Sequence, residues 1–215
     1  TGGNTTAIGA GATAASSGVD KTVDLGSTAL GSGAIASGSN STAMGRNSTA
    51  SGNGAQALGY QAIARGENSI AMGRQANACA TGTTAIGACA KASGEYATAL
   101  GTNSFATGTY STAGGHLANA RGDGATAVGY RSLANGQEAL ASGYQSEASG
   151  TKSIALGTST TAGAINAIAI GTGAKAFQVN STAIGAGALS RSALGGSNSS
   201  VTLGQDGDGA TDYFL

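Results

Sequence analysis

The sequence predicts an all-β solenoid in which short parallel strands from fourteen-residue coils stack on one another. Three observations predict this fold. Alanine recurs every fourteen residues from Ala29 to Ala183, and a second alanine series with the same period runs from Ala36 to Ala176. Glycine recurs in step with both from Gly31 to Gly185. None of the series is interrupted, so the units are expected to share one structure and to pack on their neighbours.

Each unit contains two short runs of small residues that end before a glycine. One copy reads Ser41 to Met44 before Gly45, and then Ser48 to Ser51 before Gly52. Glycine accepts a positive φ without a Cβ clash, so it is typical of tight turns between strands. The unit is therefore interpreted as one coil with two strands and two turns, and equivalent strands of successive coils are expected to pair in parallel.

Alternation along each strand predicts which side chains face inward, because neighbouring side chains point to opposite faces of a strand. One set of alternate positions in each strand carries a small residue in every unit. Examples are Ser41 and Ala43 in the first strand and Ser48 and Ala50 in the second. These sets are predicted to fill a narrow interior. The outward set of the second strand is predicted to be mostly polar, and it includes Arg65, Lys91, Asn119, Arg121, Glu147 and Lys175.

The outward set of the first strand forms an apolar stripe, which Gly114 and Ser142 interrupt. Burial of each such side chain is worth about 1.5–3 kcal/mol. A stripe of this size is not left exposed on a soluble monomer, so obligatory oligomerisation is expected. The predicted interface residues are Leu30, Met44, Leu58, Met72, Ile86, Leu100, Val128, Leu156, Ile170 and Ile184.

The unit, Ser-x-Ala-Ile-Gly followed by small-x-Ala-x-Gly, resembles the head repeat of a known family. A clear copy begins at Ser153. The family is that of the YadA-like heads of trimeric autotransporter adhesins of Gram-negative bacteria. The resemblance implies a left-handed parallel β-roll, a homotrimer that buries the stripe, and display on the bacterial cell surface. It also implies anchoring in the outer membrane through a C-terminal region absent from this chain.

The register predicts the extent of the head. Residues 1–196 are assigned to the β-roll, with an irregular insertion at about 16–26, because Gly9 and Gly31 are further apart than one repeat. Residues 197–215 are expected to form a closing coil and a flexible C-terminal tail. The aspartates at 206–212 do not match a calcium-binding loop, so no calcium site is predicted.

Composition argues against several classes of partner. The formal net charge is zero and only 9% of residues are charged, so no basic field for nucleic acid is expected. No apolar run is long enough to cross a membrane and no signal peptide is recognisable, so this fragment is not expected to insert directly into a membrane.

No catalytic residue, metal site or cofactor is predicted. The pattern Gly-x-Gly-x-x-Ala recurs five times inside the repeat without opening a helix, so it does not indicate a dinucleotide site. His116 is the sole histidine, and the acidic residues show no pairing typical of glycoside chemistry.

Three smaller features bear on surface chemistry. Arg121, Gly122 and Asp123 form the tripeptide that many integrins recognise, which makes them a possible receptor-binding site, although the repeat also produces Arg65-Gly66-Glu67. Cys79 and Cys89 differ in repeat position and are predicted to be free thiols. Tyr60, Tyr130 and Tyr144 share one turn position, where they either pack between subunits or form an exposed contact patch.

The leading functional hypothesis is a non-catalytic adhesin head. It would attach to host extracellular-matrix proteins or cell-surface receptors through the outer faces of the trimer, where many weak equivalent contacts add by avidity. The alternative is a passive spacer that presents another binding tip. An ice-binding solenoid is a third option, suggested by the column Thr84, Thr98, Thr112 and Thr126, but this column shares the apolar stripe.

Overall fold

A computed structural model describes residues 4–15, 26–191 and 200–204. The chain divides into two compact units, Thr1–Ala106 and Thr107–Leu215, and each is described by itself. The described residues form strands and turns and contain no helix, which confirms the predicted all-β parallel solenoid. The predicted insertion lies almost wholly outside the described residues, as does the predicted C-terminal tail apart from residues 200–204.

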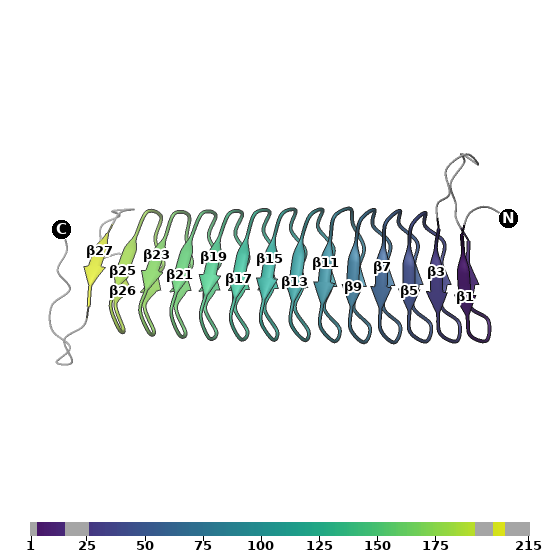
Figure 1. Cartoon of the computed structure of the whole chain (residues 1–215). Helices are drawn as coiled ribbons and strands as arrows, with labels where there is room; N and C mark the ends of the chain where they lie inside the picture. Colours follow the sequence, from purple (N-terminus) through teal and green to yellow (C-terminus); the bar gives the residue numbers. More distant parts are fainter. Residues whose placement is uncertain (1–3, 16–25, 192–199, 205–215) are drawn as a thin grey trace. The chain divides into compact units, whose positions relative to one another are not determined.

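The first unit has two parallel sheets, one of odd-numbered and one of even-numbered strands (Figure 1). We call them the first and the second sheet. The first sheet contains β1 (Thr6–Ile8), β3 (Thr28–Leu30), β5 (Thr42–Met44), β7 (Gln56–Leu58), β9 (Ile70–Met72), β11 (Thr84–Ile86) and β13 (Thr98–Leu100). The second contains β2 (Thr13–Ala14), β4 (Ile35–Ala36), β6 (Thr49–Ala50), β8 (Ile63–Ala64), β10 (Asn77–Ala78), β12 (Lys91–Ala92) and β14 (Phe105–Ala106).

The second unit repeats this arrangement. Its first sheet contains β15 (Thr112–Gly114), β17 (Thr126–Val128), β19 (Leu140–Ser142), β21 (Ile154–Leu156), β23 (Ile168–Ile170), β25 (Thr182–Ile184) and β27 (Val201–Leu203). Its second sheet contains β16 (Asn119–Ala120), β18 (Leu133–Ala134), β20 (Glu147–Ala148), β22 (Thr161–Ala162), β24 (Lys175–Ala176) and β26 (Leu189–Ser190).

Strand pairing follows the fourteen-residue period. Ala43 of β5 is the partner of Ala57 of β7, and Ala50 of β6 is the partner of Ala64 of β8. Backbone hydrogen bonds continue through the turns, where Gly59 N donates to Met44 O at 2.7 Å. Each coil is thus tied to its neighbour along nearly its whole length, which leaves few backbone groups of the inner coils unpaired.

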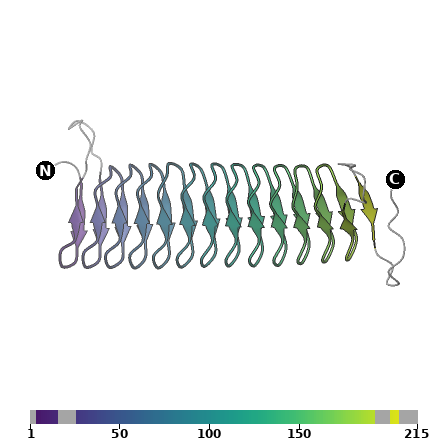
Figure 2. The same cartoon turned by 180° about the vertical axis from the view of Figure 1, so that it is seen from behind.

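Two turns close each coil, and glycine is required in the first of them. In the copy at Gly45 to Ser48, Gly45 has a φ of 134° and Asn47 a φ of 57°, and Ser48 N donates to Gly45 O at 3.2 Å. Residues with a side chain rarely adopt a φ like that of Gly45, which explains why glycine recurs at this position without interruption. Within each unit, the first turns follow one edge of the strands and the second turns the opposite edge (Figure 1, and from behind in Figure 2).

The interior of each coil contains only small side chains, as the alternation predicts. Ala43 and Ala50 are fully buried, and so are their equivalents in the other inner coils. The largest side chains that are fully buried are those of Thr83, Thr160 and Thr202. Several interior hydroxyls satisfy turn carbonyls: Ser48 Oγ donates to Gly45 O at 2.9 Å. The two sheets therefore approach too closely for a larger residue to fit between them.

The outer face of the second sheet is mostly polar, as the alternation predicts. Apolar side chains occupy a minority of its outward positions, among them Ile35 and Phe105 in the first unit and Leu133 and Phe177 in the second. Ile35 is 41% exposed and Phe177 45% exposed. The outward side chains of this sheet do not pack in the interior of the coil, so its outward positions accept both polar and apolar residues.

Candidate functional site

The predicted interface residues lie on the outer face of the first sheet. Each is the last residue of an odd-numbered strand. All are half-buried or exposed in the single chain, and Leu100, for example, is 41% exposed. Ile8 pairs in register with Leu30, and Leu203 with Ile184, so both extend the column that the sequence indicated. Each unit thus presents an apolar column on the outside of its first sheet.

The Arg-Gly-Asp tripeptide lies in a second turn of the second unit. Arg121 and Asp123 are exposed. Asp123 Oδ1 accepts a hydrogen bond from Thr109 N at 2.9 Å, and Arg121 Nη1 donates to Asn135 Oδ1 at 3.4 Å. A Cβ added to Gly122 would lie 2.0 Å from Gly136 O. Both charged side chains therefore contact neighbouring coils, and the tripeptide belongs to the coil rather than to a projecting loop.

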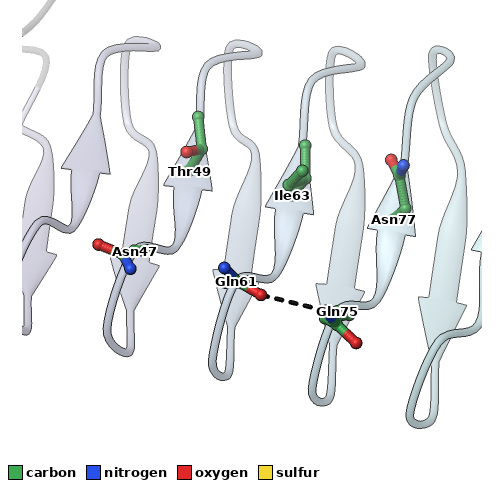
Figure 3. Close-up of a pocket in the computed structure, with 6 residues that line it drawn as sticks. All are labelled: Asn47, Thr49, Gln61, Ile63, Gln75 and Asn77. Atoms are coloured by element: carbon green, nitrogen blue, oxygen red, sulfur yellow. Dashed lines mark hydrogen bonds between the residues drawn. The ribbon is translucent and has the colours of Figure 1, made fainter.

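A row of amide side chains follows the first turns of the first unit. Asn47, Gln61 and Gln75 occupy equivalent positions on successive coils, each with a φ of 54–57°. Gln75 Nε2 donates to Gln61 Oε1 at 3.1 Å, which links two coils through their side chains (Figure 3). The left-handed backbone places these side chains in a row along the edge of the solenoid.

An open groove of about 360 Å³ lies beside this amide row. Its other wall consists of outward side chains of β6, β8 and β10, namely Thr49, Ile63 and Asn77 (Figure 3). None of the six lining residues is charged. The groove thus offers amides and a hydroxyl around one apolar side chain, and these polar groups can orient a ligand by hydrogen bonds.

Aromatic and cationic side chains lie next to the amide row. In the first unit the guanidinium of Arg46 sits 4.6 Å from the centre of the Tyr60 ring, and Arg74 Nη1 donates to Gln75 Oε1 at 3.1 Å. In the second unit Tyr130 lies 5.3 Å from the Arg131 guanidinium and stacks on Tyr144 at 5.1 Å. The tyrosines therefore pack within their own chain, along the solenoid edge.

The two kinds of turn differ in charge, because the described second turns carry both signs and the described first turns only one. Among the described residues, the first turns carry Arg46, Arg74 and Arg131 and no acidic side chain. The described acidic residues lie in second turns, at Glu67, Glu95, Asp123 and Glu138, or on β20, at Glu147. The first turns consequently form an edge with positive charge, although the whole chain is neutral.

The two cysteines are free, as predicted, and the structure shows both to be half-buried. Cys79 Sγ donates to Asn77 Oδ1 at 2.8 Å, and Cys89 Sγ lies 3.6 Å from Gln75 Oε1. Both thiols thus contact side chains that line the groove. Cys89 occupies the next position of the amide row, with a φ of 57°.

The described residues contain no group of three or more histidine, cysteine, aspartate or glutamate side chains placed to hold a metal ion. His116 contacts Tyr130 at a ring distance of 5.4 Å. Within the same part of the chain, no helix has the length and apolar character that crossing a membrane requires.

Sequence reasoning missed the amide row and the groove. The sequence did contain a signal for this row. The position two residues after the first-turn glycine is an asparagine or glutamine in five coils, at Asn47, Gln61, Gln75, Asn103 and Gln145. Sequence reasoning examined the columns of small and apolar residues and did not compare this polar column. The alignment of these side chains into a row depends on the left-handed backbone conformation, which only the structure shows.

Comparison with known proteins agrees with the repeat and the fold. The family described as the YadA head domain repeat matches residues 25–48, 45–66, 50–76, 64–88, 78–104, 92–116, 106–132, 134–160 and 162–188. The chain belongs to the YadA head repeat family. The matched segments include all the coils that hold the amide row, the tripeptide and the predicted interface residues.

A solved structure also resembles this chain. It is the crystal structure of the collagen-binding domain of the Yersinia adhesin YadA, with a TM-score of 0.52 and 24% sequence identity. The similarity covers 72% of this chain and 80% of that one. At this identity the likeness establishes the fold. A search of curated proteins found no match. Family and fold are those of an adhesin, and outer-membrane display follows from the family.

Proposed function

We propose that this chain is the non-catalytic head of a bacterial surface adhesin. In this proposal, three copies form left-handed β-rolls that pack side by side and attach to host extracellular-matrix proteins or cell-surface receptors through their outer faces. Membership of the YadA head repeat family is the observation that carries the proposal. The likeness in fold to the collagen-binding domain of a Yersinia adhesin adds support.

The homotrimer accounts for the apolar column of the first sheet. Met44, Met72 and Leu100 are each about 40% exposed in the single chain, although their neighbours along the strand are completely buried. Partner copies would cover this column and gain about 25 cal/mol for each Å² of apolar surface removed from water. The interior cannot supply much of this energy, because it consists of alanine, serine and threonine side chains.

The repeated geometry supports attachment by many weak contacts. Equivalent outward side chains recur once per coil, about 4.8 Å apart, in each unit. A fibrous or repetitive ligand can engage several positions together, so its apparent affinity exceeds that of any one contact. Display on the bacterial surface would place these columns where host matrix is available.

Two measurements on one purified sample test the proposal. Light scattering is expected to give the mass of three chains, and the same trimer is expected to bind immobilised collagen, fibronectin or laminin. A folded monomer would contradict the interface on the first sheet. A stable trimer that binds none of these proteins, nor host cells, would favour the passive spacer.

A further inference from the structure

We infer that the first-turn edge of the first unit binds a linear acidic glycan, a chain that carries sulfate or carboxylate groups together with hydroxyls. This inference rests on the proposed adhesive function, because such glycans are components of host surfaces and matrix. The site consists of the groove formed by Asn47, Thr49, Gln61, Ile63, Gln75 and Asn77, with Arg46, Arg74 and Lys91 beside it.

Charge is the first argument for an anionic ligand. Arg46 and Arg74 are both exposed and stand two coils apart, which is about 10 Å along the direction in which the coils stack. Lys91 is the register partner of the groove residue Asn77 and is also exposed. No acidic side chain lies in the first turns or on the outer face of the second sheet in the described part of this unit. A polyanion would therefore meet cations without opposing charge.

The second argument is that the guanidinium groups of Arg46 and Arg74 are held by neutral groups and not by carboxylates. Arg46 rests on the Tyr60 ring, and Arg74 donates to the Gln75 amide, so each is held in place by a neutral group. No ion pair with a carboxylate is found for either of them in the described residues. A guanidinium that is oriented but not neutralised can form paired hydrogen bonds with an incoming sulfate or carboxylate.

The amide row is the argument for a glycan. Each amide offers both donors and acceptors, which suits hydroxyl groups that also donate and accept. Gln75 Oε1 already accepts from Arg74, and Gln61 Oε1 accepts from Gln75 Nε2. The amide nitrogen of Gln61 and the second N–H of Gln75 Nε2 are left to donate to a ligand. The spacing of one coil presents these groups at a short regular interval, as a chain of sugar units requires.

An acidic peptide fits this surface less well. One way in which an extended peptide gains affinity is by adding a strand to a free sheet edge. Here the backbone of the groove coils is already paired: Gln61 N donates to Arg46 O and Gln75 N to Tyr60 O. The groove therefore offers side chains alone, and these match a ligand with hydroxyl and acid groups better than one that needs backbone pairing.

The test compares binding of the folded head to three immobilised glycans. Heparin is sulfated, hyaluronan carries carboxylates without sulfate, and dextran is neutral. We expect the head to bind heparin, to bind hyaluronan more weakly, and not to bind dextran. The heparin affinity should fall as the salt concentration rises, because exposed charges are screened. Stronger binding to hyaluronan than to heparin would identify carboxylate as the preferred group.

Matched variants locate the site. Replacing both Arg46 and Arg74 with alanine should weaken heparin binding about tenfold or more. The control replaces Lys152 and Lys175 with alanine, which removes the same charge from exposed positions of the second unit and should change affinity less than about twofold. The pair Gln61→Ala and Gln75→Ala should weaken binding with an unchanged salt dependence, because the amides would contact hydroxyls.

Several outcomes would overturn the inference. They are no binding to either acidic glycan, an equal loss in the lysine control, or binding of polyglutamate as tight as that of heparin. The same sample is also tested for binding to collagen, fibronectin and laminin. This second assay distinguishes failure of the glycan inference from failure of the proposed adhesive function. A head that binds matrix protein but no acidic glycan would retain the adhesive function and lose this site.

Discussion

Tyr130 and Tyr144 stack one coil apart in the second unit, with ring centroids separated by 5.1 Å and planes inclined by 12°. The stack arises because the repeat places the same turn position of adjacent coils in register. Side chains that are fourteen residues apart in sequence thus become direct neighbours. The same relationship produces the Gln61–Gln75 hydrogen bond in the first unit.

The tyrosine stack is expected to stabilise the solenoid. In a double-mutant cycle with Tyr130→Ala and Tyr144→Ala, the coupling in the free energy of unfolding should be about 0.5–1.5 kcal/mol. Urea unfolding of the two single variants and the double variant measures this coupling. Strictly additive losses would mean that the rings pack independently of each other.

Two adjacent glycines should respond differently to the same substitution. Gly115 has a φ of 129°, and an added Cβ would lie 2.6 Å from Gly129 O. Gly115→Ala should therefore lower the free energy of unfolding by about 1–3 kcal/mol. Gly114→Ala is the control, since its Cβ would meet only Val128 at 3.7 Å, and it should be neutral or slightly stabilising. Equal melting temperatures for the two variants would contradict this account of the turn.

The narrow interior should reject a larger side chain. Ala92 is fully buried between the sheets, and its neighbour Lys91 is exposed on β12. Ala92→Leu should cost at least about 1–3 kcal/mol of stability, because neither sheet can move without straining the coils on both sides. Lys91→Leu adds an apolar side chain outside and should change stability by less than about 0.5 kcal/mol. Chemical denaturation of the two variants makes the comparison.

The proposed trimer interface can be tested by placing charge on the first sheet. Leu100→Asp combined with Leu156→Asp should abolish the trimer, because a buried unpaired carboxylate costs several kcal/mol. Light scattering and circular dichroism are expected to show unfolded single chains. A folded trimer that carries both aspartates would place the interface on another face. Lys91→Asp, on the opposite sheet of the first unit, is the control and should remain a trimer.

The Arg-Gly-Asp tripeptide gives a further prediction. Asp123→Asn keeps an oxygen that can accept the hydrogen bond from Thr109 N and removes the charge that integrin recognition needs. We expect this variant to fold normally and to attach to cells as the unmodified head does, because the turn holds both charged side chains against neighbouring coils. A clear loss of attachment at equal stability would assign the tripeptide to receptor binding.

Much of the fold could be predicted from the positions of small residues. The series through Ala43 and Ala50 predicted two strands per coil, their parallel pairing and the narrow interior, and the structure confirms all three. These predictions succeeded because the interior has room only for small side chains, so packing restricts the sequence at every coil. The stripe through Leu100 was visible for a related reason, since it alternates with buried alanines.

The outward surface was harder to predict, because packing does not restrict it. The outer face of the second sheet is mostly polar as predicted, but the groove around Ile63 was not predicted. The free state of Cys79 and Cys89 was predicted correctly from strand spacing, because the distance between coil positions is set by the backbone.

The amino-acid sequence by itself determined the period, the inward-facing residues and the family, because a regular backbone imposes its spacing directly on the chain. Only the tertiary structure decided which outward residues meet. The left-handed backbone at Asn47 and Gln61 brings amides into a row, and the separation of first from second turns collects Arg46 and Arg74 on an edge without acids. Such contacts depend on the direction of side chains in space. Residues fourteen positions apart become neighbours only when the coils stack.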